Sequence, residues 1–203
     1  MKEGHVDLGN YAHFMQKEIF EQPQAIRDTL ESRITNNSVV LSAFGDDAKE
    51  IFNRVKQVQI IACGTSYNAG LVAKYWLEDI AKIPCNVEVA SEYRYRRPVI
   101  LNDTLFITLS QSGETADTLE ALKTAKIINS NISTLCITNS AESSLTRLSD
   151  LTFLTHAGPE IGVASTKAFT TQLVALALFT CSIGKLKNSI NKKQEKGIID
   201  GLK

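Results

Sequence analysis

The chain has 203 residues and carries 22 Lys and Arg against 22 Asp and Glu, so its formal net charge at pH 7 is zero. Hydrophobic residues make up 43% of the sequence and charged residues 22%, a composition that excludes an intrinsically disordered chain. The balanced charge argues against nucleic-acid binding, because proteins of that class carry surplus basic residues that neutralise phosphates. The length predicts one large domain, or one domain with extensions.

The cysteine and histidine pattern does not indicate a zinc site, because there is no C-x-x-C motif and the histidines are far apart. The histidines are His5, His13 and His156. Neither His13 nor His156 lies in a recognisable acid–base context, so we expect both to be structural. Cys85, Cys136 and Cys181 lie in apolar runs and are predicted to be small buried hydrophobic residues.

Targeting and membrane signals are weak. The first ten residues lack the apolar segment of a secretory signal. The most apolar stretch, residues 173–179, is shorter than the about 20 residues that span a bilayer. We therefore expect a soluble cytoplasmic protein without a membrane partner.

The predicted elements begin with a helical pattern over residues 15–34, which Pro23 interrupts. Because a proline inside a helix removes a donor and clashes with the preceding turn, two helices are expected to meet at Gln22–Pro23. A short helix over 46–55 follows, with Asp46 or Asp47 in its first turn.

From residue 58 onward, apolar strands alternate with helices. The strands are predicted at 58–62, 87–90, 105–109, 133–138 and 151–155. The helices are predicted at 67–81, 91–96, 115–128, 143–148 and 165–183, before a charged amphipathic tail over 185–203. Continuously apolar strands between helices indicate an α/β protein: a three-layer αβα sandwich with a five-stranded parallel sheet, preceded by N-terminal helices. Ligands of such folds bind at the carboxyl ends of the strands.

The first turn at that edge contains Cys63, Gly64, Thr65 and Ser66. A helix cap with a glycine turn explains it without any ligand. It contains neither a G-x-G-x-x-G fingerprint nor a Walker A lysine. Cys63 lies beside a helix N-terminus, which favours a reactive thiolate, but no partner base is evident in the sequence. We therefore expect Cys63 to line a binding pocket and not to act as a nucleophile.

The second turn, Ser110 to Thr115, combines three hydroxyls and a glycine with a helix N-terminus. A plain helix cap needs one hydroxyl and leaves the other two unexplained. Backbone amides and hydroxyls can bind an anion without a lysine, so this turn predicts a phosphate cradle. Glu114 would repel the phosphate and is expected to face away from it.

The third turn runs from Ala157 to Lys167. Gly158, Pro159 and Gly162 specify a definite loop path, and its length favours a wall of a binding pocket. Ser165 or Thr166 can cap the following helix. For Lys167 and Glu160, an exposed surface position and a functional role both remain open.

Four segments resemble a known family. The segment SQSGETADT (Ser110–Thr118) resembles the phosphosugar-binding segment of the sugar isomerase (SIS) fold. The segments HFMQKEIFEQP (His13–Pro23), ACGTSYNAG (Ala62–Gly70) and EIGVASTKAFTTQL (Glu160–Leu173) resemble the glutamine–fructose-6-phosphate aminotransferase family. The resemblance covers residues 13–183, and the first of these three segments is the most particular to that family.

The resemblance implies that Ser110, Ser112 and Thr115 hold the phosphate of a sugar phosphate, with Ser66 assisting. It implies no metal and no organic cofactor. The expected ligands are fructose 6-phosphate or glucosamine 6-phosphate.

The resemblance also implies contacts to the sugar itself. Gln111 and Thr65 would contact sugar hydroxyls, and Cys63 would line the pocket. Val163 would offer a backbone contact, and Ser165 a hydroxyl near the open-chain sugar.

Members of the family join a glutaminase domain to two SIS subdomains, and they convert fructose 6-phosphate and glutamine into glucosamine 6-phosphate. Their acid–base glutamate, ring-opening histidine and active-site lysine lie in the second SIS half, so no catalytic residue is expected here. We expect an N-terminal helical extension (1–45), the first SIS domain (46–184) and a tail (185–203) leading to an absent second SIS domain. Such a chain would be inactive alone.

Two other functions stay open, a SIS-family fructosamine-phosphate deglycase and a non-catalytic phosphosugar sensor. A homodimer is also expected, because the helix predicted at 165–183 has apolar residues on several faces.

Overall fold

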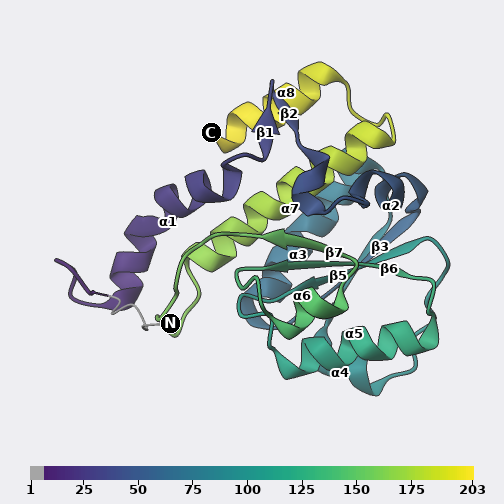
Figure 1. The fold of residues 1–203 in the computed structure, drawn as a ribbon, viewed down its shortest axis with the longest axis horizontal. Helices are drawn as coiled ribbons and strands as arrows, with labels where there is room; N and C mark the ends of the chain where they lie inside the picture. The colour runs from purple at the N-terminus through teal and green to yellow at the C-terminus, as the bar shows by residue number, and fades with distance from the viewer. Residues whose placement is uncertain (1–6) are drawn as a thin grey trace.

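The computed structural model describes residues 7–203, so His5 lies outside the described part. Its main sheet contains β3 (Gln57–Ala62), β4 (Cys85–Val89), β5 (Thr104–Leu109), β6 (Ser133–Thr138) and β7 (Leu151–Leu154). These strands are all parallel and lie in the order β4-β3-β5-β6-β7. Figure 1 shows this sheet with helices on both of its sides. The predicted five-stranded parallel sheet is confirmed, and the carboxyl ends of its strands share one edge.

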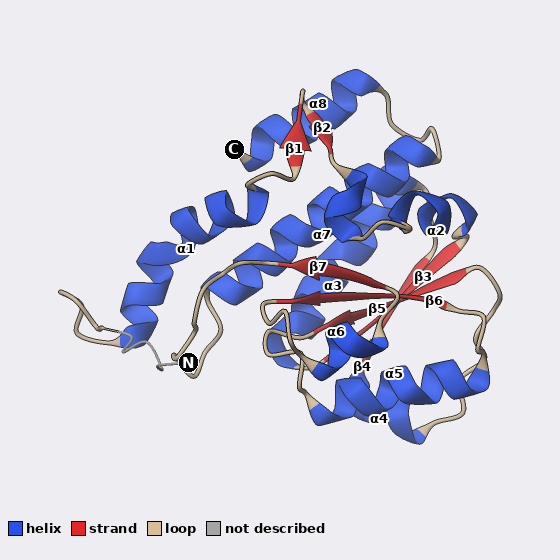
Figure 2. Ribbon diagram, viewed as in Figure 1, coloured by secondary structure: helices blue, strands red, loops and turns tan. Residues whose placement is uncertain are grey.

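Eight α-helices are assigned in the described residues. They are α1 (Phe14–Leu30), α2 (Ala48–Arg54), α3 (Gly64–Trp76), α4 (Ala90–Tyr95), α5 (Ala116–Ile128), α6 (Ser144–Leu148), α7 (Lys167–Leu186) and α8 (Lys192–Leu202). Helices α4 and α5 cover one face of the sheet, while α2, α3 and α7 cover the other (Figure 2). Neighbouring residues of a strand therefore enter different cores: Ile60 packs with Phe179, and Ile61 packs with Tyr93 and Phe106.

Helix α1 runs through Pro23 without a break, so the predicted division into two helices is wrong. A proline lacks the N–H that would bond to the carbonyl four residues earlier, here that of Ile19. The side-chain amide of Gln22 donates to this carbonyl at 3.0 Å and replaces the missing bond. Thr170 of α7 donates its hydroxyl to the other side of the Gln22 amide. Packing against α7 therefore maintains a helix that the local sequence disfavours.

The N-terminal region ends in structure that the sequence did not predict. After α1, a small antiparallel hairpin forms from β1 (Ile34–Thr35) and β2 (Ser38–Val39), followed by a 3₁₀ helix η1 (Leu41–Phe44). Arg33 connects this region to the sheet, because its guanidinium lies 4.3 Å from the centre of the Phe153 ring and donates to the carbonyl of Leu154. The segment from α1 to η1 therefore packs onto the α/β unit, with contacts between α1 and α7 and between η1 and β7.

Helix α7 is the one helix in residues 7–203 that is long and apolar enough to cross a membrane. Two thirds of its most apolar window is buried inside the protein, as in the core helix of a soluble fold. It contacts α1, α3, α2 and α8, so its apolar faces are covered by this same chain. The apolar character of α7 therefore does not support a dimer, contrary to the argument from the sequence.

Several predicted boundaries shift by one to three residues. Helix α3 begins at Gly64 instead of Tyr67 and continues into a π-helical turn, Leu77–Ala81. Helix α7 begins at Lys167 instead of Ser165. The tail forms α8, which Asn191 and Gln194 begin with a reciprocal capping box.

Candidate functional site

The strand order reverses between β3 and β5. The chain passes from β3 to β4 on one side, then returns to β5 on the other side of β3. The crevice at such a reversal, outside the carboxyl ends of the strands, is where doubly wound folds bind ligands. The first turn follows β3 and the second follows β5, so the topology brings them to this crevice.

The second turn is held together by its own hydroxyls. The Ser110 hydroxyl lies 2.9 Å from the Thr115 hydroxyl and accepts the N–H of Gly113 at 3.1 Å. The Ser112 hydroxyl accepts the N–H of Glu114 at 3.2 Å. Ser110 is buried, whereas Ser112 is exposed at the crevice. These bonds within the turn therefore stabilise its conformation.

Backbone donors remain available in this turn. Among the described residues, the N–H groups of Gln111, Ser112 and Thr115 have no hydrogen-bond acceptor. They lie at the N-terminus of α5, where the helix dipole favours an anion. Donors arranged in this way suit an anion, and the phosphate cradle expected from the sequence stays a prediction.

Gly113 is required by the shape of the turn. Its φ of 68° lies in the left-handed region, and an added Cβ would overlap the Ser143 side chain at the N-terminus of α6. The Gly113 carbonyl also accepts the N–H of Leu145 at 3.2 Å. The second turn is thus packed directly against α6.

Glu114 points to α6, where its carboxylate accepts the backbone N–H of Ser144 at 2.6 Å. This bond favours the ionised carboxylate and lowers the pKa of Glu114. The carboxylate is committed to α6, which agrees with the expectation that it faces away from a phosphate.

The first turn begins α3 at Gly64, whose φ is 57°. Thr65 is exposed and Cys63 is half-buried, while the buried Ser66 hydroxyl accepts a bond at 3.0 Å from the side-chain amide of Gln172 on α7. Gln172 is 2% exposed, and its Oε1 atom has no partner in the described residues. Sequence reasoning missed Gln172 because it lies within an apolar helical pattern.

Asn139, directly after β6, connects the second turn to the third loop. Its N–H donates to the carbonyl of Gln111 at 3.0 Å. Its side chain accepts the N–H of Ala157 at 2.7 Å and donates to the carbonyl of Gly158 at 2.8 Å. The sequence interpretation did not include Asn139, although its position after a strand was a usable signal.

The third loop, residues 157–166, carries Val163 and Ser165. Glu160 reaches across it and accepts N–H groups of Thr166 at 2.8 Å and Ala168 at 3.2 Å, which caps α7. The Ser165 hydroxyl donates to the same carboxylate at 3.2 Å. The sequence placed the cap at Ser165 or Thr166, but Glu160 provides it. Val163 is fully exposed, so its side chain does not pack against the other two turns.

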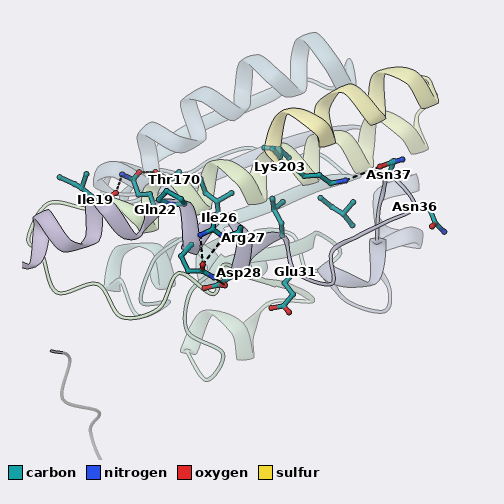
Figure 3. A pocket seen from close by; sticks show the side chains of 15 residues that line it. Ile19, Gln22, Ile26, Arg27, Asp28, Glu31, Asn36, Asn37, Thr170 and Lys203 are labelled. Atoms are coloured by element: carbon teal, nitrogen blue, oxygen red, sulfur yellow. Dashed lines mark hydrogen bonds between the residues drawn. The ribbon is translucent and has the colours of Figure 1, made fainter. Parts of the chain in front are cut away.

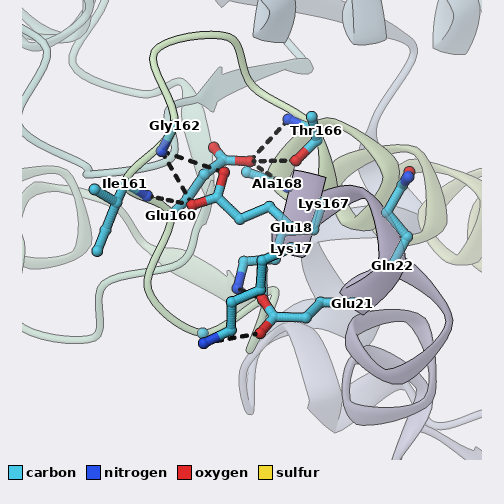
Figure 4. Close-up of polar contacts among 12 residues, drawn as sticks. Lys17, Glu18, Glu21, Gln22, Glu160, Ile161, Gly162, Thr166, Lys167 and Ala168 are labelled. Atoms are coloured by element: carbon cyan, nitrogen blue, oxygen red, sulfur yellow. Dashed lines mark hydrogen bonds and ion pairs between the residues drawn. The ribbon is translucent and has the colours of Figure 1, made fainter. Parts of the chain in front are cut away.

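Lys167 is 4% exposed, which excludes the solvated surface position considered from the sequence. Its ammonium group pairs at 2.6 Å with the carboxylate of Glu21 on α1 (Figure 4). Lys167 therefore joins α7 to α1. This ion pair directs its ammonium group to Glu21 and not to the second turn.

Cys85, Cys136 and Cys181 are buried, as predicted. Desolvation raises the pKa of each thiol to about 12, so these cysteines are poor nucleophiles. His13 stands exposed at the N-cap of α1, and His156 stands exposed after β7.

A cavity of about 1100 Å³ lies away from the three turns, between α1 and the end of α8 (Figure 3). Ile19, Pro23, Ile26 and Leu202 contribute apolar surface to it, and Arg27 borders it. None of the candidate sugar-binding residues lines this cavity.

The domain model described as "SIS domain" matches residues 51–182. The chain belongs to the SIS domain family. The matched residues contain the whole five-stranded sheet, the first two turns and most of α7. The fold expected from the resemblance is confirmed.

The relatives of this SIS chain are much longer proteins. It is 58% identical over 197 residues to the glutamine–fructose-6-phosphate aminotransferase [isomerizing] of Pseudomonas syringae pv. tomato, covering 97% of this chain and 32% of that protein. It is 57% identical over 196 residues to the enzyme of that name from Aliivibrio fischeri, with the same coverage. The chain thus spans about a third of the length of these relatives, and the resemblance to their family is confirmed.

A solved structure shows the same relation. The C-terminal domain of glucosamine-fructose-6-phosphate aminotransferase from Francisella tularensis superposes with a TM-score of 0.91 at 53% identity. The match covers 95% of this SIS chain and 54% of that domain. The chain is therefore homologous to part of the isomerase region of those enzymes.

Proposed function

We propose that this chain is the sugar-phosphate-binding SIS unit of an enzyme that makes glucosamine 6-phosphate from fructose 6-phosphate and glutamine. The observation that carries the proposal is the second turn, with hydroxyls and unpaired backbone N–H groups at the reversal between β3 and β5. The homology to aminotransferases supplies the substrate class.

In this function, Ser110, Ser112 and Thr115 hold the phosphate through the second turn, with Ser66 beside them. Gln111, Thr65 and Cys63 line the sugar. The carboxylate of Glu114 is bonded to the backbone of α6, which supports an anion site in the turn because this carboxylate is directed elsewhere.

The third loop completes the sugar site in this proposal. Val163 offers a backbone contact, and Ser165 presents a hydroxyl whose proton is directed to Glu160. The proton transfer between C1 and C2 needs a positioned acid–base group, which we assign to a second SIS unit. This chain alone would then bind sugar phosphate without isomerising it.

We propose the SIS unit at residues 46–184, with 1–45 as an extension and 185–203 as a tail toward that second unit. A homodimer is also proposed, supported by the exposed apolar side chains of Met15, Ile19 and Phe20 on α1. Light scattering at high micromolar concentration tests it, and a monomeric mass would contradict it. A cytoplasmic location is supported by four free cysteines.

Isothermal calorimetry on the chain tests the binding function. Fructose 6-phosphate and glucosamine 6-phosphate should bind in the millimolar range or tighter, inorganic phosphate more weakly, and fructose not measurably. Absence of sugar-phosphate binding at ten millimolar ligand would contradict a self-sufficient site.

Ser112→Ala removes an exposed hydroxyl of the cradle and should weaken sugar-phosphate binding by about tenfold, the effect of one hydrogen bond to a charged group. Ser140→Ala is the matched control, because Ser140 follows the neighbouring strand β6 and lies outside the proposed site. An equal loss in both variants would argue against binding in the second turn.

A further inference from the structure

The third loop is held by a carboxylate that comes from outside the α/β unit. Glu18 on α1 is 2% exposed, and its Oε1 atom accepts the N–H of Ile161 at 2.6 Å and that of Gly162 at 3.0 Å (Figure 4). Its Oε2 atom accepts the Gly162 N–H at 3.2 Å. Two consecutive backbone amides thus converge on one buried carboxylate.

The charge of this carboxylate is compensated by hydrogen bonds and not by an ion pair within the described residues. None of the ion pairs among residues 7–203 involves Glu18, although Lys167 and Lys17 pair with Glu21 one turn further along α1. A buried carboxylate is costly unless its oxygens are hydrogen-bonded, and here the loop amides provide those bonds. Glu18 therefore stabilises the one loop conformation in which both amides point at α1.

Gly162 allows α1 to lie close to the third loop. A Cβ added at Gly162 would lie 2.5 Å from Oε2 of Glu18 and 3.4 Å from the Cα atom of Met15. Gly162 leaves room for this approach. It does not adopt a left-handed φ, unlike Gly158 in the same loop.

The anchored amides directly precede Val163 and lie three residues before Ser165, the two residues of the loop assigned to the sugar. We propose that Glu18 is a positioning residue, which holds the third loop in its sugar-binding conformation before any ligand arrives. This inference rests on the proposed function. It also separates two parts of the site, because no contact of Glu18 reaches the second turn.

Glu18→Gln tests the proposal with little change in shape. The substitution keeps one acceptor oxygen and replaces the other with an amide group that faces the loop N–H groups. Without ligand, hydrogen exchange of the Ile161 and Gly162 amides, measured by NMR, should become at least about tenfold faster. Affinity for fructose 6-phosphate should fall about tenfold, while affinity for inorganic phosphate should stay within about twofold of wild type.

Glu31→Gln is the matched control, since Glu31 is an exposed glutamate at the C-cap of the same helix. It should leave both the exchange rates and the two affinities unchanged. Gly162→Ala disturbs the same contact from the side of the loop. It should reproduce the selective loss of affinity for fructose 6-phosphate. In a Glu18→Ala background, where the clash is absent, Gly162→Ala should have little further effect.

Wild-type exchange and wild-type affinity for fructose 6-phosphate in Glu18→Gln would overturn the proposal. An equal fall in the affinities for fructose 6-phosphate and inorganic phosphate would overturn it too, because that pattern indicates a general loss of structure. If the wild-type chain binds no sugar phosphate, the proposed function fails, and unchanged exchange in Glu18→Gln would still refute the anchor separately.

Discussion

The second turn, residues 110–115, and the third loop, residues 157–166, follow parallel strands of one sheet but are stabilised differently. The second turn is held by its own hydroxyls and by α6, which lies about 30 residues further along the chain. The third loop is held by carboxylates, one within it and one on α1, more than 140 residues earlier. A short turn can therefore keep its conformation locally, whereas a long loop depends on a distant helix.

This difference divides the proposed site into two parts. The phosphate-binding second turn depends on backbone geometry within one turn, whereas the sugar contacts assigned to Val163 and Ser165 in the third loop depend on how α1 sits on α7. Substitutions in the two regions should consequently differ in what they damage, and four experiments test that division.

The largest effect is expected from Gly113→Ala in the second turn. The new Cβ would combine a left-handed φ with an overlap at Ser143. Strain and a clash of this kind should lower the free energy of unfolding by about 3 kcal/mol or more, measured by urea denaturation. Binding of inorganic phosphate should be lost with it.

Gly64→Ala provides the control for backbone strain alone. Gly64 also has a left-handed φ, of 57°, but a Cβ there meets nothing within 4 Å. Gly64→Ala should lower the free energy of unfolding by about 1 kcal/mol. Equal destabilisation by the two variants would show that the contact of the second turn with α6 contributes nothing.

Lys167→Met should have the next largest effect and should act on the third loop. The substitution preserves the buried volume but removes the closer of the two lysine partners of Glu21. Breaking a buried ion pair costs several kcal/mol, but Glu21 is one-third exposed, so we expect a loss of about 1–2 kcal/mol in the free energy of unfolding. Phosphate affinity should not change.

The double variant Lys167→Met with Glu21→Gln should recover part of that loss, because it neutralises the carboxylate that Lys167→Met leaves without its close partner. Lys17→Met is the matched control, because Lys17 lies 3.7 Å from the same carboxylate. This variant should lower the free energy of unfolding by less than about 0.5 kcal/mol. If Lys167→Met and Lys17→Met lower the free energy of unfolding equally, the burial of Lys167 does not contribute to the anchoring of the loop.

The local part of the fold was predictable from the sequence. Apolar runs located all five strands of the main sheet, and hydroxyls beside Gly113 located the second turn. Pro23 misled the prediction, because the bonds that compensate it involve Thr170, far away in the sequence. The hairpin β1–β2 was missed because two-residue strands leave no periodic pattern.

The candidate site was predictable only where its contacts are local. Glu160 and Lys167 could be singled out but not assigned, since burial and partners decide between surface and structural roles. Glu18 gave no local signal of its contacts, and Asn139 gave only its position after a strand. Both act through backbone amides of a loop, and any sequence could supply those amides.

Ser165→Ala should distinguish the two parts of the site at a smaller scale. The variant removes a hydroxyl assigned to the sugar, together with a weak bond of 3.2 Å to Glu160. Calorimetry should show a loss of about threefold to tenfold in affinity for fructose 6-phosphate and no change for inorganic phosphate. Weaker binding of inorganic phosphate would show that the third loop also contacts the anion.

The smallest effect concerns the pH dependence that Glu114 adds to the second turn. The N–H of Ser144 favours its ionised carboxylate, so the pKa in the folded protein lies below the ordinary value of 4.5. The resulting stabilisation is fully present above pH 4.5 and is lost as the pH falls through the lower folded pKa. Glu114→Gln should therefore lower the melting temperature slightly at pH 7 and leave it unchanged at pH 2. Glu142 is a nearby exposed carboxylate, and Glu142→Gln should show no such difference between pH 7 and pH 2. A pH-independent effect of Glu114→Gln would mean that the charge of Glu114 does not contribute to the contact between the second turn and α6.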